Sequence, residues 1–204
     1  MIEQRGARLL RSLNCDGAYG VWLAVILLLL LLIGLACTAL RPLLEYDRSA
    51  LASGQWWRLL SAHLVHLNTR HLLFNLAGFA LLWALFARSF SAPRWLGIAC
   101  LSMIAIDAGL WFLNPDVMWY VGLSGALHGL WSAGAWAQVR RLQPRTALPL
   151  LLLILKLGFE HWRGGSAVVA DLPVVIDAHV YGALGGLVPV LPWQLRYRSR
   201  RTSL

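Results

Sequence analysis

The chain alternates between long apolar runs and short polar segments, and this pattern predicts membrane-spanning helices. Residues 21–40 form a run of twenty residues without a single charge, and an α-helix needs about 20 apolar residues to cross a bilayer. Several further runs follow. We predict six transmembrane helices, over residues 19–40, 71–86, 95–113, 123–139, 147–159 and 174–195. The fifth is the shortest and contains Lys156.

The segment 41–70 is too polar to cross a membrane, but it contains the stretch "GQWWRLL" (54–60). Tryptophan side chains prefer the boundary between lipid and water. We therefore expect an all-α membrane protein whose first two spans are joined by a long, partly interfacial loop. The six helices would occupy residues 19–195, with a basic cytoplasmic N-terminus at 1–18 and a basic cytoplasmic tail at 196–204.

Composition supports this interpretation and sets the orientation. The 204 residues are 59% hydrophobic and only 13% charged, which excludes an ordinary soluble domain. With the N-terminus inside, twelve arginines flank the spans on the inner side and five lie on the outer side. The positive-inside rule therefore predicts that both termini face the cytoplasm. We attribute the net charge of +9 to these flanking arginines and not to nucleic-acid binding.

In this orientation the second, fourth and sixth spans all run from the outer face inward. They begin with "HLLFN" (71–75), "GLSG" (122–125) and "DAHVYGALGG" (177–186). The polar side chains of the three stretches would thus lie at similar depth near the outer face. Polar and ionisable residues inside a membrane mark functional sites by default.

Small residues recur at every fourth position in the fourth and sixth spans: Gly125, Gly129 and Ala133 in one, and Ala178, Gly182 and Gly186 in the other. Such stripes let two helices approach closely in lipid. If they face each other in parallel, Ser124 and His179 meet at the same level. The alternative is an ordinary packing seam, in which the two side chains only satisfy each other.

A serine hydroxyl becomes a nucleophile when a neighbouring base removes its proton. His179 is the first candidate for that base. His128 is the second, because it lies four residues after Ser124 on the same helical face; otherwise it packs against His179 and orients it. His71 and Asn75 share one face of the second span and, with the Ser124 amide, could bind a developing oxyanion.

The sequence places no carboxylate as clearly as these groups, so we expect a Ser–His dyad. Asp177 points away from His179, and Glu160 falls in a predicted outer loop, where it would be solvated. Asp107 and Lys156 could form a structural pair between the third and fifth spans. The spacing of His63, His66 and His71 does not give one helical face, and the cysteines lack metal-type spacing. We expect no metal and no cofactor.

The three stretches resemble, in the same order, the signatures of the rhomboid intramembrane serine proteases. These are a His-x-x-x-Asn pair, a Gly-x-Ser-Gly motif and an Ala-His-x-x-Gly-x-x-x-Gly motif. The resemblance implies that Ser124 is the nucleophile, framed by Gly122 and Gly125, and that His179 is the base. "WWRLLSAHLVH" (56–66) resembles the family's loop, with Trp57, Arg58 and a structural histidine, His66.

Ordinary rhomboids usually have tyrosine where this chain has His128, and "GLSGALHG" (122–129) resembles the rhombosortase branch. That branch implies a bacterial inner-membrane enzyme whose active site opens toward the periplasm. Its substrates would be secreted proteins with a C-terminal Gly-Gly motif, an apolar helix and a basic end, and a lipid-linked amine could accept the product. The alternatives are a general rhomboid protease that cuts single-span proteins and an inactive rhomboid-like protein that binds membrane partners.

Overall fold

The computed structural model describes residues 2–139, 144–164 and 175–191. The helices are α1 (Ile2–Ser12), α2 (Gly17–Ala39), α3 (Arg41–Leu44), α4 (Arg48–Ala52), α5 (Arg58–Ser61), α6 (Thr69–Phe86), η1 (Ala87–Ser89), α7 (Ala92–Phe112), α8 (Ser124–Val139), α9 (Pro144–Arg163) and α10 (Ile176–Leu187). Two short strands, β1 (Tyr46–Asp47) and β2 (Trp119–Tyr120), pair antiparallel. Helices occupy all six predicted positions, which confirms the helical architecture.

Three of the described helices are long and apolar enough to cross a membrane: α2, α6 with its extension to Ser89, and α7. The count of six spans and their orientation stay predictions. α8 and α9 are shorter or more charged than these three helices. The predicted sixth span ends at residue 195, beyond the described part of α10. The basic tail at 196–204 and Arg140 and Arg141 also lie outside the described residues.

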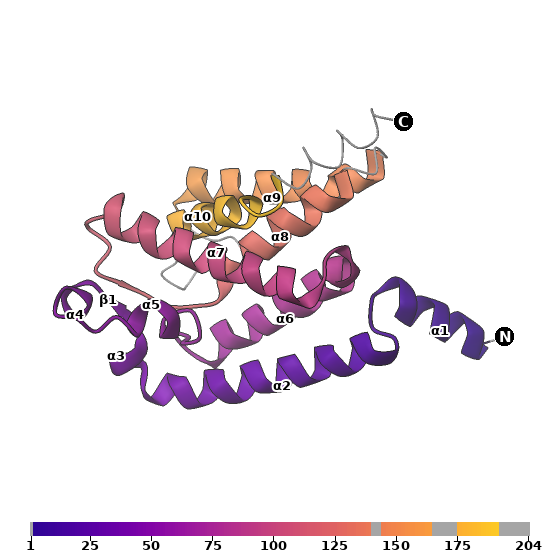
Figure 1. The fold of residues 1–204 in the computed structure, drawn as a ribbon, viewed down its shortest axis with the longest axis horizontal. Helices are drawn as coiled ribbons and strands as arrows, with labels where there is room; N and C mark the ends of the chain where they lie inside the picture. The colour runs from indigo at the N-terminus through magenta and orange to yellow at the C-terminus, as the bar shows by residue number, and fades with distance from the viewer. Residues whose placement is uncertain (1, 140–143, 165–174, 192–204) are drawn as a thin grey trace. The chain divides into compact units, whose positions relative to one another are not determined.

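The contacts of the chain divide it into two compact units. The first comprises residues 1–91 and 118–123, and the second comprises residues 92–117 and 124–204. In the first unit, α2 lies beside α6 (Figure 1). Gly34 makes this approach possible, because a Cβ at that position would lie 2.6 Å from Leu72 Cδ1.

Arg58 organises the loop between α2 and α6. Its guanidinium is buried and donates to the Gln55 side chain at 2.8 Å, to the Glu45 carbonyl at 2.8 Å and to the Pro42 carbonyl at 3.0 Å. The rigid fork of arginine donors suits it to join residues 42–45 to residues 55–58 in this way. Trp56 and Trp57 remain 64% and 55% exposed, as we expect for side chains at a membrane boundary.

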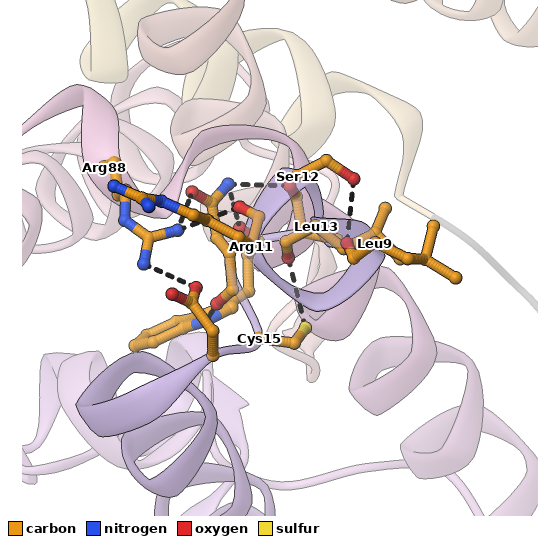
Figure 2. Close-up of polar contacts among 10 residues, drawn as sticks. Leu9, Arg11, Ser12, Leu13, Cys15 and Arg88 are labelled. Atoms are coloured by element: carbon orange, nitrogen blue, oxygen red, sulfur yellow. Dashed lines mark hydrogen bonds and ion pairs between the residues drawn. The ribbon is translucent and has the colours of Figure 1, made fainter. Parts of the chain in front are cut away.

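Arg88, in η1, fastens the turn between α1 and α2 to the end of α6 (Figure 2). Its guanidinium donates to the Arg11 carbonyl at 3.1 Å, to Asn14 Oδ1 at 3.0 Å and to the Asp16 carboxylate at 2.6 Å. The hydrogen bond from Arg88 lowers the pKa of Asp16 below its usual range. The same guanidinium lies over the Tyr19 ring, 4.2 Å from its centroid. The basic N-terminus therefore contains an anchored helix.

In the second unit, α10 packs against both α7 and α8, and α9 packs against α8 (Figure 1). Gly182 and Gly186 lie directly against the carbonyls of Gly125 and Gly129. The Ser132 hydroxyl donates across this seam to the Ala183 carbonyl at 2.7 Å. The backbones of α8 and α10 therefore approach so closely that the seam has no room for a side chain.

We predict that Gly182→Ala destabilises the protein, because the new methyl group would meet the Gly125 carbonyl. Overpacking of this kind costs about 1–3 kcal/mol, which should lower the thermal midpoint in detergent by several degrees. Gly158→Ala is the matched control: a Cβ at Gly158 in α9 meets nothing within 4 Å. Equal midpoints for the two variants would contradict the tight seam.

Candidate active site

The second unit brings Ser124 and His179 into hydrogen-bond contact. Ser124 is the first residue of α8, and His179 lies in the first turn of α10. The distance between Ser124 Oγ and His179 Nε2 is 3.0 Å. His179 is buried, whereas Ser124 retains partial exposure. The small-residue seam positions this pair, because it fixes the register of the two helices immediately below.

His128 stacks on His179. The ring centroids are 4.1 Å apart and the planes differ by 17°. His128 Nδ1 lies 2.7 Å from the Ser124 carbonyl oxygen, and Nε2 lies 2.9 Å from Lys156 Nζ. A carbonyl only accepts and an ammonium only donates, so the ring proton is on Nδ1 and the Nε2 lone pair faces Lys156. Both ring nitrogens are thus engaged, and this geometry favours His179 over His128 as the partner of the Ser124 hydroxyl.

The expectation that Glu160 is solvated in an outer loop was wrong. α9 continues to Arg163, and Glu160 is only 1% exposed. Its Oε2 atom lies 2.9 Å from His179 Nδ1, and its Oε1 atom accepts from Lys156 Nζ at 2.6 Å. A carboxylate therefore does face the histidine. The signal in the sequence was the i,i+4 spacing of Lys156 and Glu160, which places both on one face of a helix.

Lys156, considered above as a partner for Asp107, donates instead within this cluster. His128, Glu160 and His179 offer ligand atoms within 4.8 Å of one another, a donor set that zinc also uses. Here the Lys156 ammonium lies between Glu160 and His128 and supplies the positive charge that a cation would supply. We therefore interpret the three residues as a hydrogen-bonded network and not as a metal centre.

His71, Asn75 and Gly122 belong to the first unit. His71 Nδ1 accepts from the Leu67 amide at 3.4 Å, so the ring proton lies on Nε2. The Asn75 side chain is buried and donates to the His71 carbonyl at 3.1 Å. Asn68 caps α6 by accepting from the His71 amide. These contacts hold two hydrogen-bond donors on one face of α6.

Position 122 favours glycine for two reasons. Its φ is +118°, and a Cβ would lie 2.7 Å from His71 Cε1. Its amide donates to the Ala62 carbonyl at 2.9 Å, and its carbonyl accepts from the Tyr120 hydroxyl at 2.8 Å. The backbone just before Ser124 in the chain is therefore fixed against the His71 ring.

The remaining predicted residues fall into two places. Trp57, Arg58 and His66 lie in the loop of the first unit, where His66 is buried with its ring edge-on to His71 at 5.2 Å. The others lie along α8 and α10 in the second unit: Gly125, Gly129, Ala178, Gly182 and Gly186. None of these packing residues offers a side chain for chemistry.

Comparison with known proteins identifies the class of this helical chain. Residues 53–194 match the family model described as "Rhomboid domain". Because the match covers more than half of the chain, the protein belongs to the rhomboid family. It is also 35% identical over 79 residues to the "Putative rhomboid protease YdcA" of Bacillus subtilis (strain 168), a stretch that covers 39% of this chain and 40% of that protein. The family resemblance is confirmed, and the rhombosortase branch stays a prediction.

The titration of His66 gives a test of the loop. Burial, with a smaller effect of the neighbouring His71 ring, lowers the pKa of His66 from 6.5 to about 4. Between these values the unfolded chain binds a proton that the folded chain does not, so the free energy of unfolding falls as the pH falls. The loss is at most about 3 kcal/mol at pH 4.

We expect His66→Phe to flatten this dependence when thermal midpoints are measured from pH 7 to about pH 4. His161→Phe is the control, since the His161 side chain is 59% exposed and its 3.6 Å contact with the Asp177 carboxylate is an ion pair only when His161 is protonated, so losing it should not flatten the dependence. If wild type and His66→Phe lose stability in parallel, His66 is not held neutral by the fold.

Proposed function

We propose that this rhomboid-family protein is an intramembrane serine endopeptidase with Ser124 as nucleophile and His179 as general base. The observation that carries the proposal is the 3.0 Å contact between Ser124 Oγ and His179 Nε2. A hydroxyl needs such a partner to attack a peptide bond. The family membership and the name of the Bacillus relative support the same activity.

In the proposed reaction Ser124 Oγ attacks the carbonyl carbon of the substrate while His179 Nε2 takes the hydroxyl proton. The tetrahedral intermediate collapses, the C–N bond breaks, and His179 gives the proton to the leaving amine. An acyl-enzyme at Ser124 remains. Water then attacks this ester and regenerates the serine, or an amine attacks it and is acylated.

The oxyanion of the intermediate would be bound by the His71 ring, the Asn75 side chain and the Ser124 amide. Two features support this assignment. The His71 ring proton is on Nε2, which makes that atom a donor. The Ser124 amide begins α8, where helix N–H groups have no intrahelical acceptor. Removing one such donor typically costs about 10²–10³ in rate.

For the substrate we propose the C-terminal sorting tails of secreted proteins, made of a Gly-Gly motif, an apolar helix and a basic end. The support is His128, which stands where ordinary rhomboids usually have tyrosine and which stacks on His179. Glycines unwind readily and pass through a narrow site because they lack side chains. Cleavage would occur near the periplasmic face of the bacterial inner membrane, with a lipid-linked amine as one acceptor for the acyl group.

The nucleophile and the base are tested by the intact mass of a Gly-Gly-tailed substrate made together with the enzyme. We expect Ser124→Ala and His179→Ala to abolish cleavage, a loss of about 10⁴-fold or more. His128→Ala should keep partial activity. Ser53→Ala and His161→Ala are matched controls on exposed side chains. Unchanged cleavage by Ser124→Ala would end the serine-protease proposal.

The substrate class is tested with the same tail after the two glycines are replaced by valines. We expect this change to abolish cleavage, because valine leaves a helix less readily than glycine and its side chain would fill the site. Cleavage that ignores the change would favour a general rhomboid protease instead. A product heavier than that of hydrolysis, by the mass of an amine-bearing lipid headgroup, identifies transfer.

A further inference from the structure

Five groups in the second unit form a closed circuit of hydrogen bonds. It runs from Ser124 Oγ to His179, from His179 to Glu160, from Glu160 to Lys156, from Lys156 to His128, and from His128 back to the Ser124 carbonyl. Each link is 2.6–3.0 Å long. The circuit contains a carboxylate that a Ser–His dyad does not require.

Glu160 is held in one orientation. One carboxylate oxygen faces His179 Nδ1 and the other faces the Lys156 ammonium, and the side chain is 1% exposed. A buried carboxylate is costly unless it is paired and hydrogen-bonded. Lys156 provides that pairing from the preceding turn of the same helix, so Glu160 is present as the ionised acceptor.

An ionised carboxylate only accepts hydrogen bonds, and this decides the tautomer of His179. Its ring proton must lie on Nδ1, directed at Glu160. The lone pair on Nε2 then faces Ser124 Oγ and can take the hydroxyl proton. When it does so, the imidazolium forms beside a negative charge, which stabilises it.

Glu160 leaves the Nε2 lone pair of His179 available to the serine proton, whereas Lys156 makes the Nε2 lone pair of His128 unavailable. Its ammonium donates to His128 Nε2, which keeps that lone pair from competing for the serine proton. His128 and His179 are stacked at 4.1 Å, and two positive rings at that distance would repel each other. The cation therefore keeps His128 neutral while His179 acquires its charge.

We infer that Glu160 is the positioning residue of a Ser124–His179–Glu160 triad and that Lys156 holds Glu160 ionised. This inference rests on the proposed function. It assigns to the chain a third member that the motifs of the second, fourth and sixth predicted spans do not contain. Glu160 acts through His179 and does not itself touch the substrate.

The test is Glu160→Gln. Because Lys156 donates, the new amide turns its oxygen toward the ammonium and its NH₂ group toward His179. That orientation favours the Nε2–H tautomer, which cannot accept the serine proton. We expect kcat to fall by about 100-fold or more, as loss of the correct tautomer does in other triads. KM should change by less than about threefold, since Glu160 makes no contact with substrate.

Glu160→Asp keeps the negative charge, so its kcat should be at least about tenfold higher than that of Glu160→Gln. Glu45→Gln is the matched control, because Glu45 also pairs with a cation four residues earlier, Arg41, but in the first unit. It should retain wild-type kcat. A kcat for Glu160→Gln within about threefold of wild type would overturn the triad, as would equal losses in the Gln and Asp variants.

Nitrogen NMR of isotope-labelled histidine gives a second readout that does not depend on activity. We expect the His179 signal to report the Nδ1–H tautomer in the wild-type protein and the Nε2–H tautomer in Glu160→Gln. An unchanged tautomer would overturn the inference even if cleavage is observed. If the tautomer switches between the wild type and Glu160→Gln but the wild-type protein cleaves nothing, the positioning role stands and the proposed function is rejected.

Discussion

The candidate site depends on one ion pair, between Lys156 and Glu160 in α9. Charged groups are stable in an apolar surrounding only when their hydrogen-bonding capacity is met, and this pair meets it by binding a histidine at each end. The carboxylate determines the proton position on His179, and the ammonium determines that on His128. Both rings have their proton on Nδ1, but Nε2 of His179 faces the Ser124 hydroxyl whereas Nε2 of His128 faces the Lys156 ammonium, although the ring centroids are only 4.1 Å apart.

The ion pair acts on Ser124 only because α8 and α10 lie so close. Gly125 and Gly129 face Gly182 and Gly186 with backbone against backbone, which leaves the separation to be set by main-chain atoms. A Cβ at Gly182 or Gly186 would overlap the carbonyl of Gly125 or Gly129, so a side chain there would force the two helices apart. Packing without side chains is thus the mechanical basis of the 3.0 Å contact.

In the first unit, hydrogen bonds satisfy and position backbone groups. Arg58 satisfies carbonyls of a loop that would otherwise have to be solvated, and Gly122 is tied to Ala62, Tyr120 and the ring of His71. The proposed oxyanion donors on α6 are oriented by contacts within the same unit, since His71 Nδ1 accepts from the Leu67 amide and the Asn75 side chain donates to the His71 carbonyl. Preorganised donors of this kind account for much of the catalytic effect of an enzyme.

The sequence by itself determined the helical architecture, the stripes of small residues and the candidate residues Ser124, His179, His71 and Asn75, because periodic apolar runs and rare polar residues in them are local signals. It did not reveal Glu160. A lysine and a glutamate near the end of an apolar run look like the start of a solvated loop, since hydropathy counts each charge alone. Only the tertiary structure shows that α9 continues to Arg163. It also shows that Lys156 and Glu160 pair with each other and that each contacts one histidine. The tautomers of those histidines are likewise a property of the packed helices, because each proton's position is set by a partner distant in the chain.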